Sequence, residues 1–361
     1  MRLVETSAKA SAIGQGVIMK IIHTADVHLD SPFIGVDGKT RRRELISAFS
    51  SMAQYADNIG AAAVIVAGDL FDDSFATDAT IKSVADVINA SKARWYVLQG
   101  NHGDDSPYKK LAKLANVHRF GTDWTKYDLG NVTVCGKELT SADVGAFSPL
   151  PLDTGRFNIV VLHGDVDSDA YGHIDKKTLS DGKISYVALG HRHRLETFSF
   201  GTTRACYCGA LEPRGFDEGP DGGFVVIDTD SGDVKHVKQS IRSVVTKTVD
   251  VSSLGSEIAL ERAVLDAVAD VSARNYLNLV LTGSADADMR TEFVARQATE
   301  GKFFALRIQN NVTTRRNMAE ILAEVSLRGE FARQATSQID DPELKSRVLE
   351  LGLKLLEGGQ L

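Results

Sequence analysis

The sequence of 361 residues is poor in the residues on which several protein classes depend. Cysteine occurs only at Cys135, Cys206 and Cys208, and proline occurs seven times. Three cysteines without paired spacing exclude a disulfide framework and, with no signal-like apolar segment, lead us to expect a reducing, cytoplasmic compartment. No apolar run approaches the roughly 20 residues of a membrane-spanning helix, so no membrane partner is expected.

Basic residues are not in excess either. Lysine and arginine number 41 against 48 aspartates and glutamates, and the formal net charge is −7. This balance weakens a DNA-binding hypothesis without excluding it, because local patches and metal ions carry their own positive potential. The length exceeds that of one typical domain and predicts two domains with a substantial core.

What the sequence does contain is a series of short apolar runs that end abruptly in polar residues. Residues 64–67 are followed by Gly68 and Asp69, which is typical of a buried parallel strand that delivers a carboxylate to its C-terminal edge. Ligands of open α/β sheets bind at this edge, so the polar residues are expected to converge. Four further runs end in the same way: 21–25 before Asp26 and His28, 95–99 before Asn101 and His102, 159–162 before His163, and 186–189 before His191 and His193.

The residue types at these strand ends predict a metal centre. Aspartate and histidine favour manganese, iron and zinc, and the lack of thiolates disfavours a purely structural zinc site. A carboxylate can bridge two ions, whereas an imidazole or an amide holds one. Seven ligands with one bridging carboxylate would give each of two ions four protein ligands and leave positions open for water and a phosphate oxygen. Such a centre is typical of a phosphoesterase.

The order of predicted elements indicates an α/β fold. Strands and helices alternate first, strands dominate from about residue 131, and the pattern predicts two sheets flanked by helices, a four-layer α-β-β-α sandwich. The expected divisions are a disordered extension over 1–18, a catalytic domain over 19–240, a small α+β capping domain over 241–316, and a C-terminal segment over 317–361 with two helices.

Five short motifs carry a resemblance to a known family. They are residues 26–28, 68–72, 100–102, 163–164 and 190–193. In this order they resemble the motifs of the calcineurin-like metallophosphoesterases, over roughly residues 19–240. Within that superfamily the chain is similar to the SbcD-type DNA repair exonucleases, especially the bacterial YhaO-like branch. Residues 23–33, 207–209, 215–218 and 327–331 carry this narrower resemblance.

The resemblance implies roles for individual residues. His102 corresponds to the family's histidine that binds no metal and stabilises or protonates the leaving oxygen, and Asp72 corresponds to its carboxylate partner. The implied ligands are Asp26, His28, Asp69 and His193 for one ion, and Asp69, Asn101, His163 and His191 for the other.

The resemblance also implies cofactors and partners. The expected ions are two divalent cations, manganese first, with iron or zinc as alternatives. The expected substrate is DNA, and the expected partner is an SMC-like ATPase of the SbcC type, bound through the helix predicted over 341–357. A homodimer remains open. Two alternative functions also remain: a phosphodiesterase for a small nucleotide or another small phosphodiester, and a non-catalytic scaffold subunit of an ATPase complex.

Overall fold

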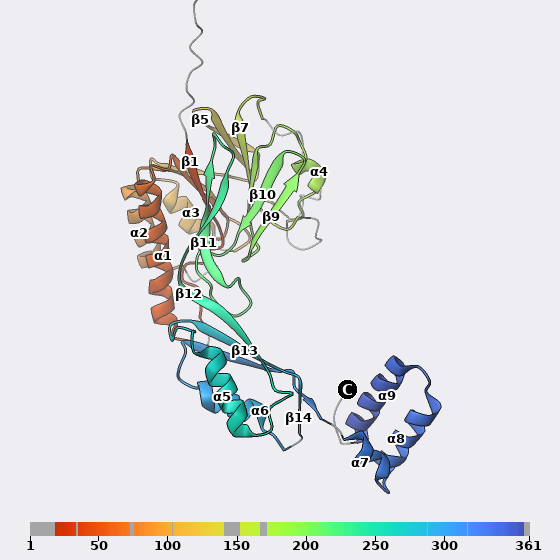
Figure 1. Cartoon of the computed structure of the whole chain (residues 1–361). Helices are drawn as coiled ribbons and strands as arrows, with labels where there is room; N and C mark the ends of the chain where they lie inside the picture. Colours follow the sequence, from red (N-terminus) through yellow and green to blue (C-terminus); the bar gives the residue numbers. More distant parts are fainter. Residues whose placement is uncertain are drawn as a thin grey trace, which may run out of the picture. The chain divides into compact units, whose positions relative to one another are not determined.

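The computed structural model describes residues 19–33, 35–72, 76–102, 104–140, 152–166, 172–286, 288–315 and 317–356 (Figure 1). The extension predicted over 1–18 lies outside these ranges. The chain forms two compact units. Unit 1 comprises the chain up to Val245 with Ser272–Leu277 and Phe303–Ala305, and unit 2 comprises Thr246–Val271, Asn278–Lys302 and the chain from Leu306 onward.

Two sheets organise the described part of the chain. The larger has the strand order β15-β13-β12-β11-β1-β2-β3-β4, and the second has the order β5-β6-β7-β8-β10-β9. The strands of the larger sheet are β1 (Lys20–Thr24), β2 (Ala63–Ala67), β3 (Arg94–Leu98), β4 (Val117–Arg119), β11 (Asp221–Asp228), β12 (Val234–Asp250), β13 (Tyr276–Thr282) and β15 (Ala305–Asn310). Those of the second sheet are β5 (Thr125–Leu129), β6 (Val132–Gly136), β7 (Phe157–His163), β8 (Tyr186–Gly190), β9 (Leu195–Phe200) and β10 (Thr203–Cys208).

Strands β1 to β4 are parallel because a helix crosses back between each pair: α1 (Gly38–Asn58), α2 (Asp78–Ala90) and α3 (Asp105–Leu111). Strand β2 is buried on both faces along its whole length, and β1 and β3 are buried after their first residue, which explains the apolar runs in these three strands. In β2, Val64 and Val66 pack toward the helices, while Ile65 packs against the second sheet.

Three layers of apolar side chains hold unit 1 together. The first lies between the helices and the larger sheet, the second between the two sheets, and the third on the outer face of the second sheet. The predicted four-layer α/β architecture is therefore confirmed. Among the described residues, the outermost layer on the second sheet contains only the one-turn helix α4 (Lys176–Leu179) and loops.

The division of the chain differs from the one expected at residue 240. Strand β12 is continuous from Val234 to Asp250, and the two units divide at Val245/Thr246. The first residues of β13 and β15 also belong to unit 1, so the boundary passes through three strands rather than through one linker. In unit 2, strands alternate with the helices α5 (Glu257–Val268) and α6 (Thr291–Thr299), which pack on each other. The short strands β14 (Ser284–Ala285) and β16 (Thr313–Thr314) form a separate pair.

The C-terminal segment forms three helices in the described residues, where the sequence predicted two. They are α7 (Met318–Ala323), α8 (Leu327–Gln338) and α9 (Pro342–Leu356). The first predicted helix is divided because the Ser326 side chain accepts a hydrogen bond from the Gly329 amide at 3.0 Å and starts a new helix. None of the described helices has the length and apolar character needed to cross a membrane.

Candidate metal centre

The residues predicted as metal ligands follow the C-terminal ends of five strands: β1, β2 and β3 in the larger sheet, and β7 and β8 in the second. Backbone hydrogen bonds join the loops after the first three strands. The amide of His28 donates to the Asp69 carbonyl at 3.0 Å, and the amide of Asp69 donates to the Gln99 carbonyl at 2.8 Å. The relative positions of these side chains are therefore determined by the pairing of the strands.

The first predicted ligand set converges. The Nε2 atoms of His28 and His193 lie 3.2 Å apart. Asp26 Oδ1 lies 3.9 Å from the Nε2 atom of His193. Asp69 Oδ2 lies 3.8 Å from the Nε2 atom of His28. Three of these residues, Asp26, His28 and His193, form a group whose ligand atoms all lie within 4.8 Å of one another.

The second set meets the first at Asp69. Its Oδ2 atom lies 3.2 Å from His163 Nε2. Asn101 Oδ1 lies 2.8 Å from His163 Nε2 and 3.1 Å from His191 Nδ1. One oxygen of Asp69 thus faces histidines of both sets, which is the arrangement that a bridging carboxylate requires.

The backbone is strained where it presents these ligands. Among the described residues, five other than glycine have a positive φ between +20° and +160°, and four of them are predicted ligands. The values are 52° for Asp26, 48° for His28, 51° for Asp69 and 102° for His191. Left-handed backbone at non-glycine residues is uncommon and concentrates at functional sites.

Two glycines make room for the ligands. Gly68 and Gly100 have φ values of 99° and 89°. A Cβ atom at Gly68 would overlap the ring of His163, and one at Gly100 would overlap the carboxylate of Asp69. These positions explain why a glycine ends both apolar runs.

Hydrogen bonds to the second ring nitrogen orient the histidines. His193 Nδ1 lies 2.9 Å from Glu218 Oε1, and His163 Nδ1 lies 2.9 Å from the Ala67 carbonyl. Both partners are acceptors, so each Nδ1 donates and each Nε2 faces the centre of the site. His191 is turned the other way, with Nε2 3.6 Å from Asp165 Oδ2 and Nδ1 toward the site.

The electrostatics of the site suit cation binding. Burial, with Arg214 nearby, lowers the pKa of His28 to about 2, so its imidazole is neutral. Burial alone would lower the pKa of His163, but the adjacent Asp69 carboxylate raises it to about 9, so a cation bound at Nε2 would displace a proton. Burial by itself would raise the pKa of Asp69. The neighbouring histidines His163 and His28 have the larger, opposite effect, so the pKa of Asp69 lies below its usual range. Buried oxygen and nitrogen donors around one ionised carboxylate fit two divalent cations.

His102 lies beside the ligands with a carboxylate partner. Its Nδ1 atom lies 3.7 Å from Asp72 Oδ1, and its backbone amide donates to Asp69 Oδ1 at 3.0 Å. The His102 side chain is 40% exposed, whereas that of Asp72 is 12% exposed. His102 can therefore reach a bound substrate while Asp72 stays behind it.

Four residues that contact the site were not assigned a role from the sequence: Ser31, Asp165, Arg214 and Glu218. Ser31 and Glu218 lay in motifs that carried the family resemblance, residues 23–33 and 215–218, so their positions gave a signal. Asp165 accepts a hydrogen bond from Arg192 Nε at 2.8 Å and faces His191. No local pattern pointed to Asp165 or Arg214.

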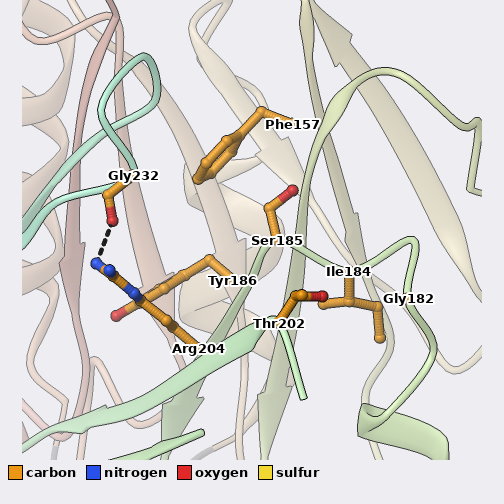
Figure 2. A pocket seen from close by; sticks show the side chains of 8 residues that line it. All are labelled: Phe157, Gly182, Ile184, Ser185, Tyr186, Thr202, Arg204 and Gly232. Atoms are coloured by element: carbon orange, nitrogen blue, oxygen red, sulfur yellow. Dashed lines mark hydrogen bonds between the residues drawn. The ribbon is translucent and has the colours of Figure 1, made fainter. Parts of the chain in front are cut away.

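A separate cavity lies at the opposite ends of the strands (Figure 2). It has a volume of about 290 Å³ and lies where β7 and β8 begin, whereas the predicted ligands follow the ends of these strands. Its wall contains no histidine or carboxylate, so it is not part of the metal centre. The lining residues are Phe157, Gly182, Ile184, Ser185, Tyr186, Thr202, Arg204 and Gly232.

Comparison with known proteins agrees with this geometry. The family model described as Calcineurin-like phosphoesterase matches residues 19–207, which is slightly more than half of the chain. The match contains every residue of the predicted ligand set and the His102–Asp72 pair. A phosphoesterase is a hydrolase, and the aspartate and histidine clusters are of a kind that can hold divalent metals.

Three curated relatives are distantly similar. The chain is 25% identical over 297 residues to "Uncharacterized metallophosphoesterase YhaO" of Bacillus subtilis (strain 168), covering 74% of this chain and 72% of that protein. It is 26% identical over 292 residues to "DNA double-strand break repair protein Mre11" of Halobacterium salinarum, with 70% of each chain covered. It is also 26% identical over 227 residues to the protein of the same name from Methanosarcina acetivorans, covering 58% of this chain but only 36% of that longer protein.

Proposed function

Since this chain belongs to the calcineurin-like phosphoesterase family, we propose that it is a metal-dependent nuclease that hydrolyses phosphodiester bonds of DNA. The observation that carries the proposal is the convergence of six oxygen and nitrogen ligands around a seventh, Asp69, with His102 and Asp72 at their edge. The DNA substrate rests on the similarity to Mre11 proteins, whose name refers to double-strand break repair.

We assign the ligands to two divalent cations, with manganese as the preferred ion. Asp26, His28, Asp69 and His193 would hold one, and Asp69, Asn101, His163 and His191 the other. When bound, the two cations supply a water that ionises near neutral pH and positive charge that stabilises the phosphoryl oxygens. The carbonyl of Ala67 and the carboxylates of Asp165 and Glu218 keep three of the imidazoles turned toward the site.

His102 acts on the leaving group. Hydrolysis forms a P–O bond from water and breaks the P–O bond to the leaving oxygen. The protonated imidazole of His102 gives its proton to that oxygen, the proton of the attacking water passes to solvent, and His102 is later reprotonated from solvent. Asp72 faces His102 Nδ1 at 3.7 Å and stabilises the charged ring.

A comparison of substrates tests this function. Purified protein with manganese is incubated with duplex DNA, single-stranded DNA, a cyclic nucleotide and bis-p-nitrophenyl phosphate, and Asp69→Asn serves as the control for contaminating nuclease. Cleavage of DNA by the wild type and not by Asp69→Asn supports the proposal. Hydrolysis of the small substrates alone would favour the alternative of a small phosphodiester, which the net charge of −7 also permits. Metal binding without any hydrolysis would favour the scaffold.

We further propose that α9 docks an SMC-like ATPase in a DNA repair complex. One face of this helix packs in a small core with Leu353, while Leu344, Leu351 and Leu355 are exposed. Their spacing of seven and four residues places these three leucines in one stripe, which suits packing against a helical partner.

Co-purification with the purified ATPase tests this contact. Leu344→Glu with Leu351→Glu should abolish it, whereas Ile258→Glu, at another exposed apolar residue on α5, should not. If the double variant instead dissociates a dimer of this chain in sedimentation experiments, the stripe is a homodimer contact.

A further inference from the structure

Arg214 lies between two carboxylates that face opposite parts of the centre. Its side chain is 18% exposed and contacts both Asp72 and Glu218. Asp72 belongs to the pair with His102, and Glu218 orients the ligand His193. Arg214 therefore links the carboxylate beside His102 to the carboxylate that orients His193.

The contact with Asp72 determines how that carboxylate is turned. Asp72 Oδ2 accepts a hydrogen bond from Ser31 Oγ at 2.5 Å and lies 3.4 Å from Arg214 Nη1. The other oxygen, Oδ1, is left to face the Nδ1 atoms of His102 at 3.7 Å and of His28 at 4.0 Å. Ser31 and Arg214 are themselves 3.2 Å apart, so the two donors hold Oδ2 together.

The opposite side of Arg214 is anchored. Its backbone amide donates to Glu218 Oε2 at 2.7 Å and its Nε to Glu218 Oε1 at 2.9 Å. Its own carbonyl accepts from Tyr276 Oη at 3.3 Å. These contacts fix the backbone of Arg214 and the Nε atom of its guanidinium. The Nη1 atom is therefore already held toward Asp72 before the reaction begins, and little side-chain entropy has to be lost.

We propose that Arg214, together with Ser31, is a positioning residue that turns Asp72 Oδ1 toward His102 and thereby supports proton donation to the leaving oxygen. The inference rests on the proposed function and adds to it the residues that orient Asp72 and, through Asp72, His102. Arg214 acts through Asp72 and need not touch the substrate. Its loss should therefore affect the reaction only when the leaving oxygen needs a proton.

Two substrates with different leaving groups test this role. Thymidine 5′-p-nitrophenyl phosphate releases a phenolate that leaves without protonation, whereas a thymidine dinucleotide releases an alkoxide that needs a proton. Arg214→Met should lower kcat for the dinucleotide about 10–100-fold, the usual scale for residues that orient a catalytic group, and change kcat for the phenolate substrate far less. Arg214→Lys should recover part of the loss because it keeps the charge. Arg156→Met is the matched control and should change neither, because this partly buried arginine lies just before β7 and contacts Asp128 and Thr133, away from the site.

A double-mutant cycle tests whether Arg214 acts through His102. In a His102→Ala background, Arg214→Met should cause little further loss, because residues that act as a unit are not additive. Arg214 also contacts Glu218, and its Nη2 atom lies 3.2 Å from His193 Nδ1, so kcat is compared at saturating manganese. Equilibrium dialysis and circular dichroism, which do not depend on turnover, should show that both ions and the fold are retained under these conditions. Equal losses for both substrates, or additive losses in the cycle, would overturn the role of Arg214 while leaving the wild-type activity intact. A wild type inactive on every phosphodiester would instead reject the proposed function itself.

Discussion

The Nε2 atoms of His28 and His193 face each other at 3.2 Å, although the two residues are 165 positions apart in the chain. His193 donates its Nδ1 proton to Glu218, so its Nε2 atom carries a lone pair. Two imidazole lone pairs at this distance repel unless a proton or a cation lies between them. A proton on the Nε2 atom of His28 or a divalent cation can fill this place, and the adjacent carboxylates of Asp26 and Asp69 favour the cation.

Metal binding should stabilise the fold. At free manganese 100-fold above its dissociation constant, the free energy of unfolding should rise by about 2.7 kcal/mol, and a chelator should reverse the gain. Thermal unfolding with and without manganese measures this effect. Asp69→Asn, which removes the charge shared by both ligand sets, should lose most of the shift. A wild-type melting temperature insensitive to manganese would contradict the ligand assignment.

Substitution of His102 should separate binding from turnover. His102→Ala should retain both metals, because its imidazole is outside the ligand set, and lose turnover by about 10²–10⁴-fold through the loss of general acid catalysis. Metal content by elemental analysis and kcat on a dinucleotide provide the two measurements. Undiminished kcat would exclude the assigned role, and loss of metal would make His102 a ligand.

Gly100 should be essential for the position of Asp69. Gly100→Ala should cost about 1–2 kcal/mol for the left-handed backbone and also displace the Asp69 carboxylate, so that manganese affinity falls. Gly155→Ala is the matched control, because Gly155 has a similar φ of 84° and no atom near the position of an added Cβ. Equal manganese affinity of the two variants would show that the contact with Asp69 has no consequence.

His23 should make the stability of the protein depend on pH. Burial lowers its pKa from 6.5 to about 3, and its Nδ1 lies 2.9 Å from the hydroxyl of Tyr186. Below pH 6.5 the unfolded state gains a proton on His23 that the folded state does not, so this residue lowers the free energy of unfolding by about 1.4 kcal/mol per pH unit down to about pH 3. Urea denaturation in chelator should show the wild type losing stability relative to His23→Gln by about 0.3 kcal/mol from pH 7.5 to 6.5 and by about 1 kcal/mol from pH 6.5 to 5.5. Parallel curves would mean that His23 binds a proton equally readily in the folded and unfolded states.

DNA binding should weaken steeply with salt. If phosphates are contacted by basic side chains and metals, the logarithm of the affinity should fall linearly with that of the salt concentration through counterion release. Fluorescence anisotropy with a labelled duplex between 50 and 200 mM salt measures the slope, with His102→Ala and a non-cleavable backbone to prevent hydrolysis. Affinity that does not change with salt would favour a small phosphodiester as the substrate.

The local sequence was enough to predict the apolar strands that end at the candidate metal centre and the polar residues that follow them. Apolar runs of five residues with both faces buried have few other interpretations, and a polar residue directly after such a run must lie at the sheet edge where ligands bind. Asp26, Asp69 and His163 were recognisable in this way because the backbone geometry of a strand end places them.

The remaining features depended on tertiary structure. Arg214 meets Asp72 across 142 positions of sequence, and only the relative register of the two sheets brings their loops together. The continuity of β12 and the start of α8 at Ser326 likewise depend on strand partners and a cap that hydrophobic periodicity does not encode. Residues that orient other residues leave no local pattern, because the contacts they make are between loops far apart in the chain.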